Sequence, residues 1–117
     1  MFRFEKLDAW QLAIELSDDV YRITRTFPDD ERFGLTNQTR RAAVSIAANV
    51  AEGCGRATER DFSRFIEIAY GSLMEVVSHL TIALRQKMLN AENHQMLYEK
   101  SDRLARVLSG LRKSRGE

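Results

Sequence analysis

The sequence contains little of what disulfide-stabilised, membrane-spanning or loop-rich proteins need. Its single cysteine, Cys54, excludes an internal disulfide, and one proline with six glycines leaves few positions that interrupt regular structure. No uninterrupted apolar segment approaches the ~20 residues that cross a bilayer. The first residues, MFRFEKLDAW, lack the apolar stretch of a signal peptide. We therefore expect a cytoplasmic protein without a membrane segment.

An excess of charge of one sign is also lacking. Eighteen Lys and Arg residues against 17 Asp and Glu residues leave a formal net charge of +1, which argues neither for nor against a nucleic-acid partner. The distribution is uneven, because residues 1–31 carry four basic and eight acidic side chains whereas residues 100–117 carry six and two. The length predicts one domain, residues 1–117, which buries a modest share of its surface alone, so partner subunits are expected.

Apolar residues recur at spacings of three and four along nearly the whole chain, which predicts helices. The first is expected over residues 5–27, ending at the single proline. A second follows a turn, has Thr36 as its cap and ends near residue 52. A third follows the cap Thr58, and a fourth follows the cap Asn90. Four helices with short connections predict an all-α fold, an up-down-up-down antiparallel four-helix bundle.

The second predicted helix has unusually small side chains. Its apolar face comprises Ala43, Ile46, Ala47, Val50 and Cys54. Small side chains let a neighbouring helix approach closer than the usual ~8–10 Å between axes. Gly71, midway along the third helix, is the expected point of approach, because close packing would offset the ~0.5–1 kcal/mol that a helical glycine costs relative to alanine.

The same helix carries a row of polar residues at steps of three or four. The row comprises Gln38, Arg41, Ser45, Asn49 and Glu52. One interpretation is a solvated outer face. The other is a hydrogen-bonded seam, within the bundle or between subunits, in which Glu75 and Arg64 of the antiparallel third helix would pair with the row's buried charges.

Motifs for catalysis or metal binding are missing from the sequence. A di-iron bundle needs a Glu-x-x-His motif on each of two helices, and this chain has only His79 and His94. Cys54 has no histidine near it in sequence to act as a base. The segment EGCGRAT lacks the ending of a phosphate-binding loop, and no strand precedes it. We expect no enzymatic activity, no metal and no cofactor.

Basic residues concentrate in two places, and arginine outnumbers lysine in both. The candidates for nucleic-acid contacts are Arg40, Arg41, Lys100, Arg103, Arg106, Arg112, Lys113 and Arg115. The planar guanidinium group suits phosphate contacts. One subunit's patch would bind weakly, but copies repeated around a ring would add into a strong, salt-sensitive field without any subunit being basic overall.

Two segments, FPDDERFGLTNQTRRAAVSIAANVAEGCGR and FIEIAYGSLMEV, resemble a known family. This is the bacterial four-helix-bundle family that includes proteins encoded in 23S ribosomal RNA intervening sequences, and the resemblance spans nearly the whole chain. A related branch comprises the accessory proteins of diversity-generating retroelements, which assemble into pentameric barrels and bind a reverse transcriptase together with nucleic acid. The resemblance implies a homopentamer of four-helix bundles and no settled activity.

Two functional hypotheses follow. The first is a non-enzymatic, ring-forming bundle that binds nucleic acid, RNA above all, or a ribonucleoprotein, through arginines repeated around the oligomer. The alternative is a protein-interaction scaffold that recognises one protein partner, such as a reverse transcriptase, and uses its charged ends to steer the encounter.

Overall fold

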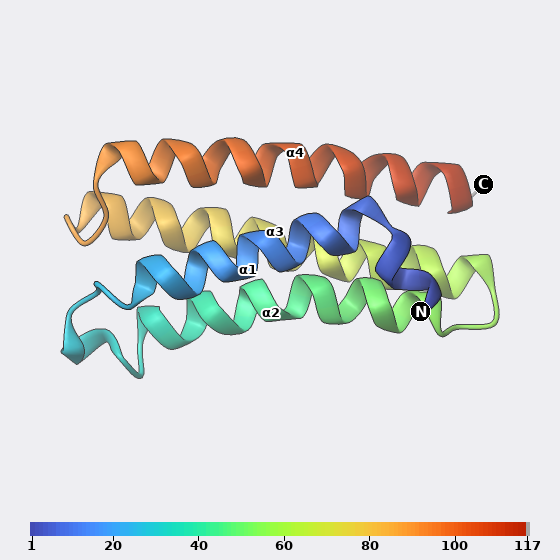
Figure 1. Ribbon diagram of the computed structural model, residues 1–117, viewed down its shortest axis with the longest axis horizontal. Helices are drawn as coiled ribbons and strands as arrows, with labels where there is room; N and C mark the ends of the chain where they lie inside the picture. The colour runs from blue at the N-terminus through green and yellow to red at the C-terminus, as the bar shows by residue number, and fades with distance from the viewer. Residues whose placement is uncertain (117) are drawn as a thin grey trace.

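Four helices arranged as an antiparallel bundle make up the fold, as the apolar spacing predicts (Figure 1). A computed structural model describes the backbone of residues 1–116 and the side chains of residues 1–113. In chain order the elements are η1 (Arg3–Lys6), α1 (Asp8–Thr24), η2 (Asp29–Glu31), α2 (Leu35–Cys54), α3 (Glu59–Arg85) and α4 (Ala91–Gly116). Successive helices run in opposite directions, and both termini lie at the same end of the bundle.

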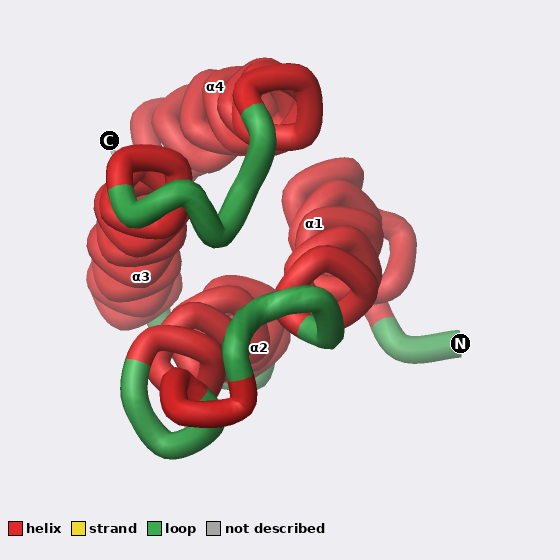
Figure 2. Tube along the Cα trace, turned by 90° about the vertical axis from the view of Figure 1, so that its left-hand side faces the viewer, coloured by secondary structure: helices red, strands yellow, loops and turns green. Residues whose placement is uncertain are grey.

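Each helix packs on two neighbours. α1 contacts α2 and α4, and α3 contacts the same two helices from the other side. Among the described residues the backbones of the diagonal pairs do not approach each other, and Figure 2 shows these helices at opposite corners. The contact between α2 and α3 is the most extensive, and that between α1 and α4 is the least. The bundle measures 43 × 23 × 23 Å.

The core lies along the axis of the bundle. Every helix contributes large apolar side chains that are at most 1% exposed, such as Leu16, Ile46, Leu73 and Leu104. The small-sided face predicted for α2 is largely buried as well, since its two alanines, Ile46 and Val50 are no more than 7% exposed. Burial of these faces supplies the main stabilisation of helices that would be marginal in isolation.

Two predicted helix caps are confirmed. The Thr58 hydroxyl accepts a hydrogen bond from the Asp61 amide at 3.1 Å and starts α3. The Asn90 side-chain oxygen accepts one from the Asn93 amide at 2.7 Å and starts α4. Each cap satisfies an amide that the first helical turn leaves without a carbonyl partner.

The predicted cap of α2 is wrong. Thr36 lies inside the helix, which begins at Leu35. The Glu31 carboxylate accepts a hydrogen bond from the Leu35 amide at 3.0 Å, so a residue from η2 replaces the expected cap. Gly34 makes room for this contact, because a Cβ at that position would lie 2.9 Å from the same carboxylate oxygen.

The bounds predicted for the first helix are also wrong. The segment before Asp8 forms the short 3-10 helix η1, and Leu7 has extended backbone angles, so α1 begins three residues later than expected. At the other end α1 stops at Thr24. Phe27 is nevertheless only 6% exposed, because the turn folds its ring back onto the core. Apolar spacing therefore predicted the burial of the Phe27 side chain but not its backbone conformation, which is non-helical.

The close approach of α2 and α3 occurs at a different glycine from the one predicted. A Cβ on Gly71 would meet nothing within 4 Å, so the prediction for that residue is wrong within this subunit. Gly53 is the buried glycine, and a Cβ there would lie 3.0 Å from the Cβ of Phe65 and 3.4 Å from the Phe62 carbonyl. The tight glycine contact between the two helices therefore lies near the end of α2.

By length and composition alone, α3 could cross a membrane, with a mean hydropathy of 1.2 in its most apolar window. One such helix is weak evidence, because core helices of globular bundles pass the same test. Eight α3 side chains are buried against the neighbouring helices. Only 33% of that window is buried, however, so part of its apolar surface faces outward.

Candidate nucleic-acid interface

The basic cluster predicted on α4 is largely neutralised by neighbouring carboxylates. Asp19 of α1 and Glu67 of α3 come from other helices, and Asp102 lies one turn away on α4 itself. The ion pairs are Lys100–Asp19 at 2.6 Å, Arg106–Asp102 at 2.8 Å and Arg112–Glu67 at 3.7 Å. A cation that already has a carboxylate partner must give it up before it can bind a phosphate, so these residues offer little net attraction.

The remaining members of that cluster differ in what surrounds them. Arg103 and Lys113 are exposed and form no ion pair within the described part of the chain. The side chain of Arg115 lies outside the described residues. Of the six candidates near the C-terminus, only Arg103 and Lys113 therefore present an uncompensated charge in the described structure.

Arg40 and Arg41 are adjacent in sequence but point to different grooves. Arg40 lies between α1 and α2, where its Nε donates to the Thr24 hydroxyl at 2.8 Å and its guanidinium sits 4.7 Å from the centre of the Tyr21 ring. Arg41 lines a hollow on the other side of α2, facing α3. The pair is thus not one patch, and Arg40 is fixed in place whereas Arg41 is exposed.

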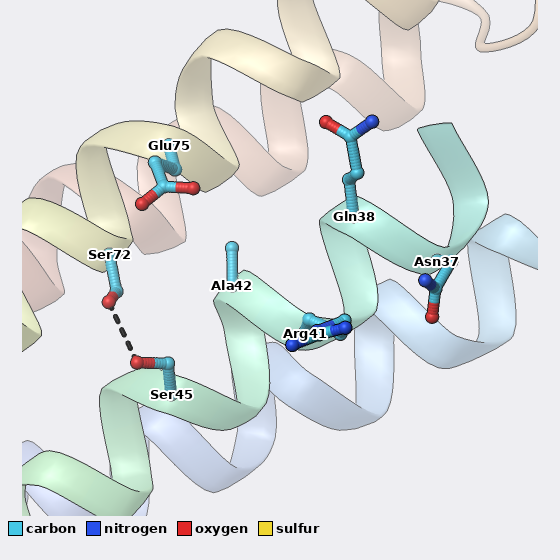
Figure 3. A pocket seen from close by; sticks show the side chains of 7 residues that line it. All are labelled: Asn37, Gln38, Arg41, Ala42, Ser45, Ser72 and Glu75. Atoms are coloured by element: carbon cyan, nitrogen blue, oxygen red, sulfur yellow. Dashed lines mark hydrogen bonds between the residues drawn. The ribbon is translucent and has the colours of Figure 1, made fainter. Parts of the chain in front are cut away.

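The hollow between α2 and α3 is polar and has a volume of about 280 Å³. Gln38 from α2 and Glu75 from α3 extend toward the space between the two helices (Figure 3). At its floor the hydroxyls of Ser45 and Ser72 lie 2.9 Å apart in a hydrogen bond that joins the two helices. Arg41 and Glu75 border the hollow without forming an ion pair in the described structure.

The polar row of α2 divides into an inner and an outer part. Ser45 and Asn49 are half-buried, and the Asn49 side-chain amide donates to the Ser45 carbonyl at 2.8 Å and to its hydroxyl at 2.9 Å. Glu52 lies outside this network and is 54% exposed, with only Arg56 near it at 3.8 Å. It is not paired with Arg64 in the described residues. The seam within one subunit therefore consists of hydroxyl and amide groups, without the charges.

The residues with catalytic potential are scattered. Among the described residues, no group of three or more His, Cys, Asp or Glu side chains comes together. On the surface, the ring of His94 lies 3.3 Å from the Thr81 hydroxyl and next to the Tyr98 ring. The side chain of Cys54 is half-buried, and its backbone carbonyl accepts a hydrogen bond from Arg3 at 3.4 Å. Among the described residues, the Cys54 thiol forms no hydrogen bond with a histidine, as a thiol nucleophile and its base would.

Sequence reasoning missed two arginines. Arg25 and Arg32 flank the turn between α1 and α2, and the fold brings both to one hollow with Arg40. The sequence holds only a weak signal for this grouping, since the segment RTFPDDER has an arginine at each end and more acidic residues between them. Their approach to Arg40 depends on the direction in which α2 leaves the turn.

Comparison with known proteins supports the fold and the family. The model of the 23S rRNA-intervening sequence protein family matches residues 5–110. A crystal structure of a protein of unknown function from the S23 ribosomal protein family of Bacteroides thetaiotaomicron superimposes with a TM-score of 0.83. That match covers 90% of this chain and 98% of the other, at 19% sequence identity, and so establishes the common fold.

No curated protein is similar enough to count as a relative. The family match, in contrast, includes all four helices except the last residues of α4. Neither the family description nor the structural neighbour names an enzymatic activity. The bundle therefore belongs to the 23S rRNA-intervening sequence protein family.

Proposed function

We propose that this protein is a non-enzymatic bundle that self-associates into a ring and binds RNA, as such or within a ribonucleoprotein, through arginines repeated around the ring. The observation that carries this proposal is the set of arginines that no carboxylate neutralises. In the described structure these include Arg25, Arg32, Arg41, Arg85 and Arg103. Each guanidinium retains N–H groups that can donate hydrogen bonds to phosphate oxygens.

Self-association is supported by the outer face of α3. Three large apolar side chains of α3, Ile68, Met74 and Ile82, are 42–46% exposed. Ile68 and Ile82 are about four helical turns apart and share a face, and Met74 lies at its border. Single exposed apolar residues are ordinary, but several on one helix are typical of a surface that a partner covers. A second copy of this chain is the occupant that we propose, because the resemblance implies a homopentamer.

Gly71, on the same face, supports the same conclusion. It lies inside α3, is exposed, and has open space where a Cβ would be. A glycine there costs the helix ~0.5–1 kcal/mol relative to alanine, and no contact within the subunit compensates. Close packing of a neighbouring copy on this face would offset that cost. The exposed charges Arg64 and Glu75 lie on the same face and have no ion-pair partner in the described subunit, so a second copy would also find charges of both signs to pair with.

Repetition explains how a nearly neutral protein binds a polyanion. Each phosphate contact releases counterions and adds to affinity, and contacts in successive subunits engage one RNA at high effective concentration. The net charge of +1 per chain then matters less than the number of arginines that face the RNA together. The affinity must therefore fall steeply as salt is added.

The experiment measures binding of a mixed single-stranded RNA, and of the matching DNA, at about 50 and about 200 mM salt. The proposal predicts binding at the lower concentration and a loss of tenfold or more at the higher one. Affinity that is absent at low salt, or that salt leaves unchanged, contradicts it.

A protein-interaction scaffold is the second candidate, and exposed aromatic residues favour it. Phe33 is 86% exposed in the α1–α2 turn and Tyr98 is 51% exposed on α4. Aromatic residues are enriched where proteins bind each other. Purification from cells with and without nuclease separates the candidates, because a partner that remains bound after digestion supports the scaffold, and one that is lost supports RNA binding.

A further inference from the structure

The corner between α1 and α2 contains a small hollow that no functional assignment has yet used. It lies at the end of the bundle where the chain turns from α1 into α2, at the left of Figure 1, and has a volume of about 190 Å³. Arg25, Arg32 and Arg40 line it, together with Thr24, Thr36 and Asp29.

Charge in this corner is strongly unbalanced. Three arginines line the hollow, against a single acidic residue, Asp29. None of these four groups belongs to an ion pair in the described structure, so Asp29 does not neutralise its neighbours. Like charges held together are unfavourable unless an anion joins them.

Arg40 is fixed before any ligand arrives. Its Nε donates to the Thr24 hydroxyl at 2.8 Å, and one terminal nitrogen donates to the Tyr21 carbonyl at 3.4 Å. Thr24 is only 2% exposed, and its own hydroxyl proton goes to the Val20 carbonyl at 2.7 Å, which leaves its oxygen to accept from Arg40. A guanidinium held in this way loses little freedom when it binds a ligand.

Thr36 adds a hydroxyl group to the lining of the hollow. Its hydroxyl has no hydrogen-bond partner among the described residues, although the residue as a whole is only 8% exposed. The hydroxyl can therefore bond to an oxygen-rich ligand in the hollow. The backbone amides of Thr36 and Asn37 also lack acceptors there, because the Gln38 amide is the first in α2 to bond a carbonyl of the preceding turn. These amides at the N-terminal end of α2 can donate to an anion, while the Glu31 carboxylate already binds the Leu35 amide and offsets part of the positive charge there.

We infer that this corner, the Arg25–Arg32–Arg40 pocket, binds a phosphate group. A phosphate carries enough negative charge to join three arginines, and its oxygens diverge so that guanidinium, hydroxyl and amide donors can all reach one. The group belongs either to RNA or to a free phosphate. Only the RNA source rests on the proposed function, because the donors of the pocket would bind a free phosphate equally.

The test begins with inorganic phosphate and a control variant that lies outside the pocket. Titration calorimetry and thermal unfolding, at ionic strength held constant with chloride, compare the wild type with the double variant Arg25→Gln, Arg32→Gln. Arg103→Gln is the control, since Arg103 is exposed and unpaired on α4. The inference predicts that phosphate raises the melting temperature of the wild type and of the control, and that the double variant binds phosphate at least about tenfold more weakly.

All three substituted arginines lie in or near the surface, and circular dichroism verifies that the variants remain folded. A phosphate effect that is absent from the wild type, or is equal in all three proteins, overturns the inference. Thr36→Val gives a second readout, because it removes the unpartnered hydroxyl without changing charge. Phosphate binding that is weaker in Thr36→Val supports direct contact, and unchanged binding removes Thr36 from the site.

The two sources of phosphate are separated with short RNAs that carry either a 5′-phosphate or a 5′-hydroxyl. If inorganic phosphate displaces RNA and the 5′-phosphorylated RNA binds more tightly than the 5′-hydroxyl RNA, the pocket binds a terminal phosphate. If inorganic phosphate displaces RNA and the two RNAs bind equally, the pocket binds the RNA backbone. If phosphate binds but no RNA does, the pocket stands and the proposed function fails. If RNA binds but phosphate has no effect, the pocket fails and the proposed function stands.

Discussion

The two basic regions of the bundle differ in what their cations contact. On α4, Lys100, Arg106 and Arg112 each meet a carboxylate. At the corner of α1 and α2, in contrast, Arg40 meets the Thr24 hydroxyl and the Tyr21 ring, and Arg32 lies over the Phe33 ring. In the sequence the basic residues of α4 form a recognisable cluster, whereas the three arginines of the corner are spread over residues 25–40. The comparison teaches that cations available to a phosphate are identified by their neighbours in space and not by their density along the chain.

The largest expected effect comes from removing charge in the two regions separately. Arg25→Gln with Arg32→Gln should weaken RNA binding by about tenfold or more and lower the slope of log affinity against log salt by about two. Arg106→Gln with Arg112→Gln, which removes the same charge, should change the affinity by less than about threefold. Fluorescence anisotropy over a salt series measures both. Equal losses in the two double variants would abolish the distinction between the regions.

A smaller effect is expected from loosening Arg40 without removing its charge. Thr24→Val deletes the buried hydroxyl that holds the Arg40 Nε and bonds to Val20, and should lower the free energy of unfolding by about 1 kcal/mol. RNA affinity should fall by a few-fold, since a mobile guanidinium loses more freedom on binding. Thr26→Val is the control, because that exposed hydroxyl bonds only to the Ile23 carbonyl. Urea unfolding that gives the same loss for both variants argues against an anchoring role for Thr24.

Releasing a cation on α4 should change the RNA affinity in the opposite direction. Asp19 bonds both Arg22, at 2.8 Å, and Lys100, at 2.6 Å, so Asp19→Asn frees two cations at once. RNA affinity should rise, by no more than about fivefold, because partly exposed pairs of this kind contribute up to ~1 kcal/mol. Asp18→Asn is matched in charge, and Asp18 is exposed with no ion pair in the described structure. An equal gain in both variants would show that total charge, not pairing, sets the affinity.

The smallest effect is expected at Glu52. The pair with Arg56 spans 3.8 Å, and both side chains are about half exposed, so Glu52→Ala should change the free energy of unfolding by less than about 0.5 kcal/mol. This variant therefore measures how little an exposed ion pair contributes to the free energy of unfolding of this protein. A loss of several kcal/mol, measured by urea unfolding, would place Glu52 in a buried contact between copies and restore the charged seam.

The sequence predicts the parts of this fold that depend on local chemistry. Thr58 and Asn90 cap their helices as expected, because a side chain and an amide three residues apart determine each cap. The cap of α2 was missed because Glu31 reaches it from a separate 3-10 helix. Likewise, the spacing of apolar residues identifies the core but cannot tell that Gly53, rather than Gly71, faces a neighbouring helix.

The candidate site was predictable only in part, for a similar reason. Arg40 was identified from its neighbour Arg41, yet the two lie in different grooves and only Arg40 joins the corner pocket. Arg25 and Arg32 were missed, because six residues that include η2 separate them and no helical spacing relates them to α2. The carboxylates that neutralise Lys100 and Arg112 come from α1 and α3, so their pairing is a property of the packed bundle.

The proposal that arginines repeated around a ring bind RNA requires that the chain associate with itself. Light scattering across a range of concentrations measures this association directly. The account predicts a particle whose mass is a whole multiple of 13.5 kDa, with five copies in the ring that the resemblance implies. Substitution of the open Gly71 by leucine should reduce that mass, while Gly110→Leu, at an equally open position of α4, should not. A wild-type particle of 13.5 kDa at every concentration, with and without RNA, would contradict the account.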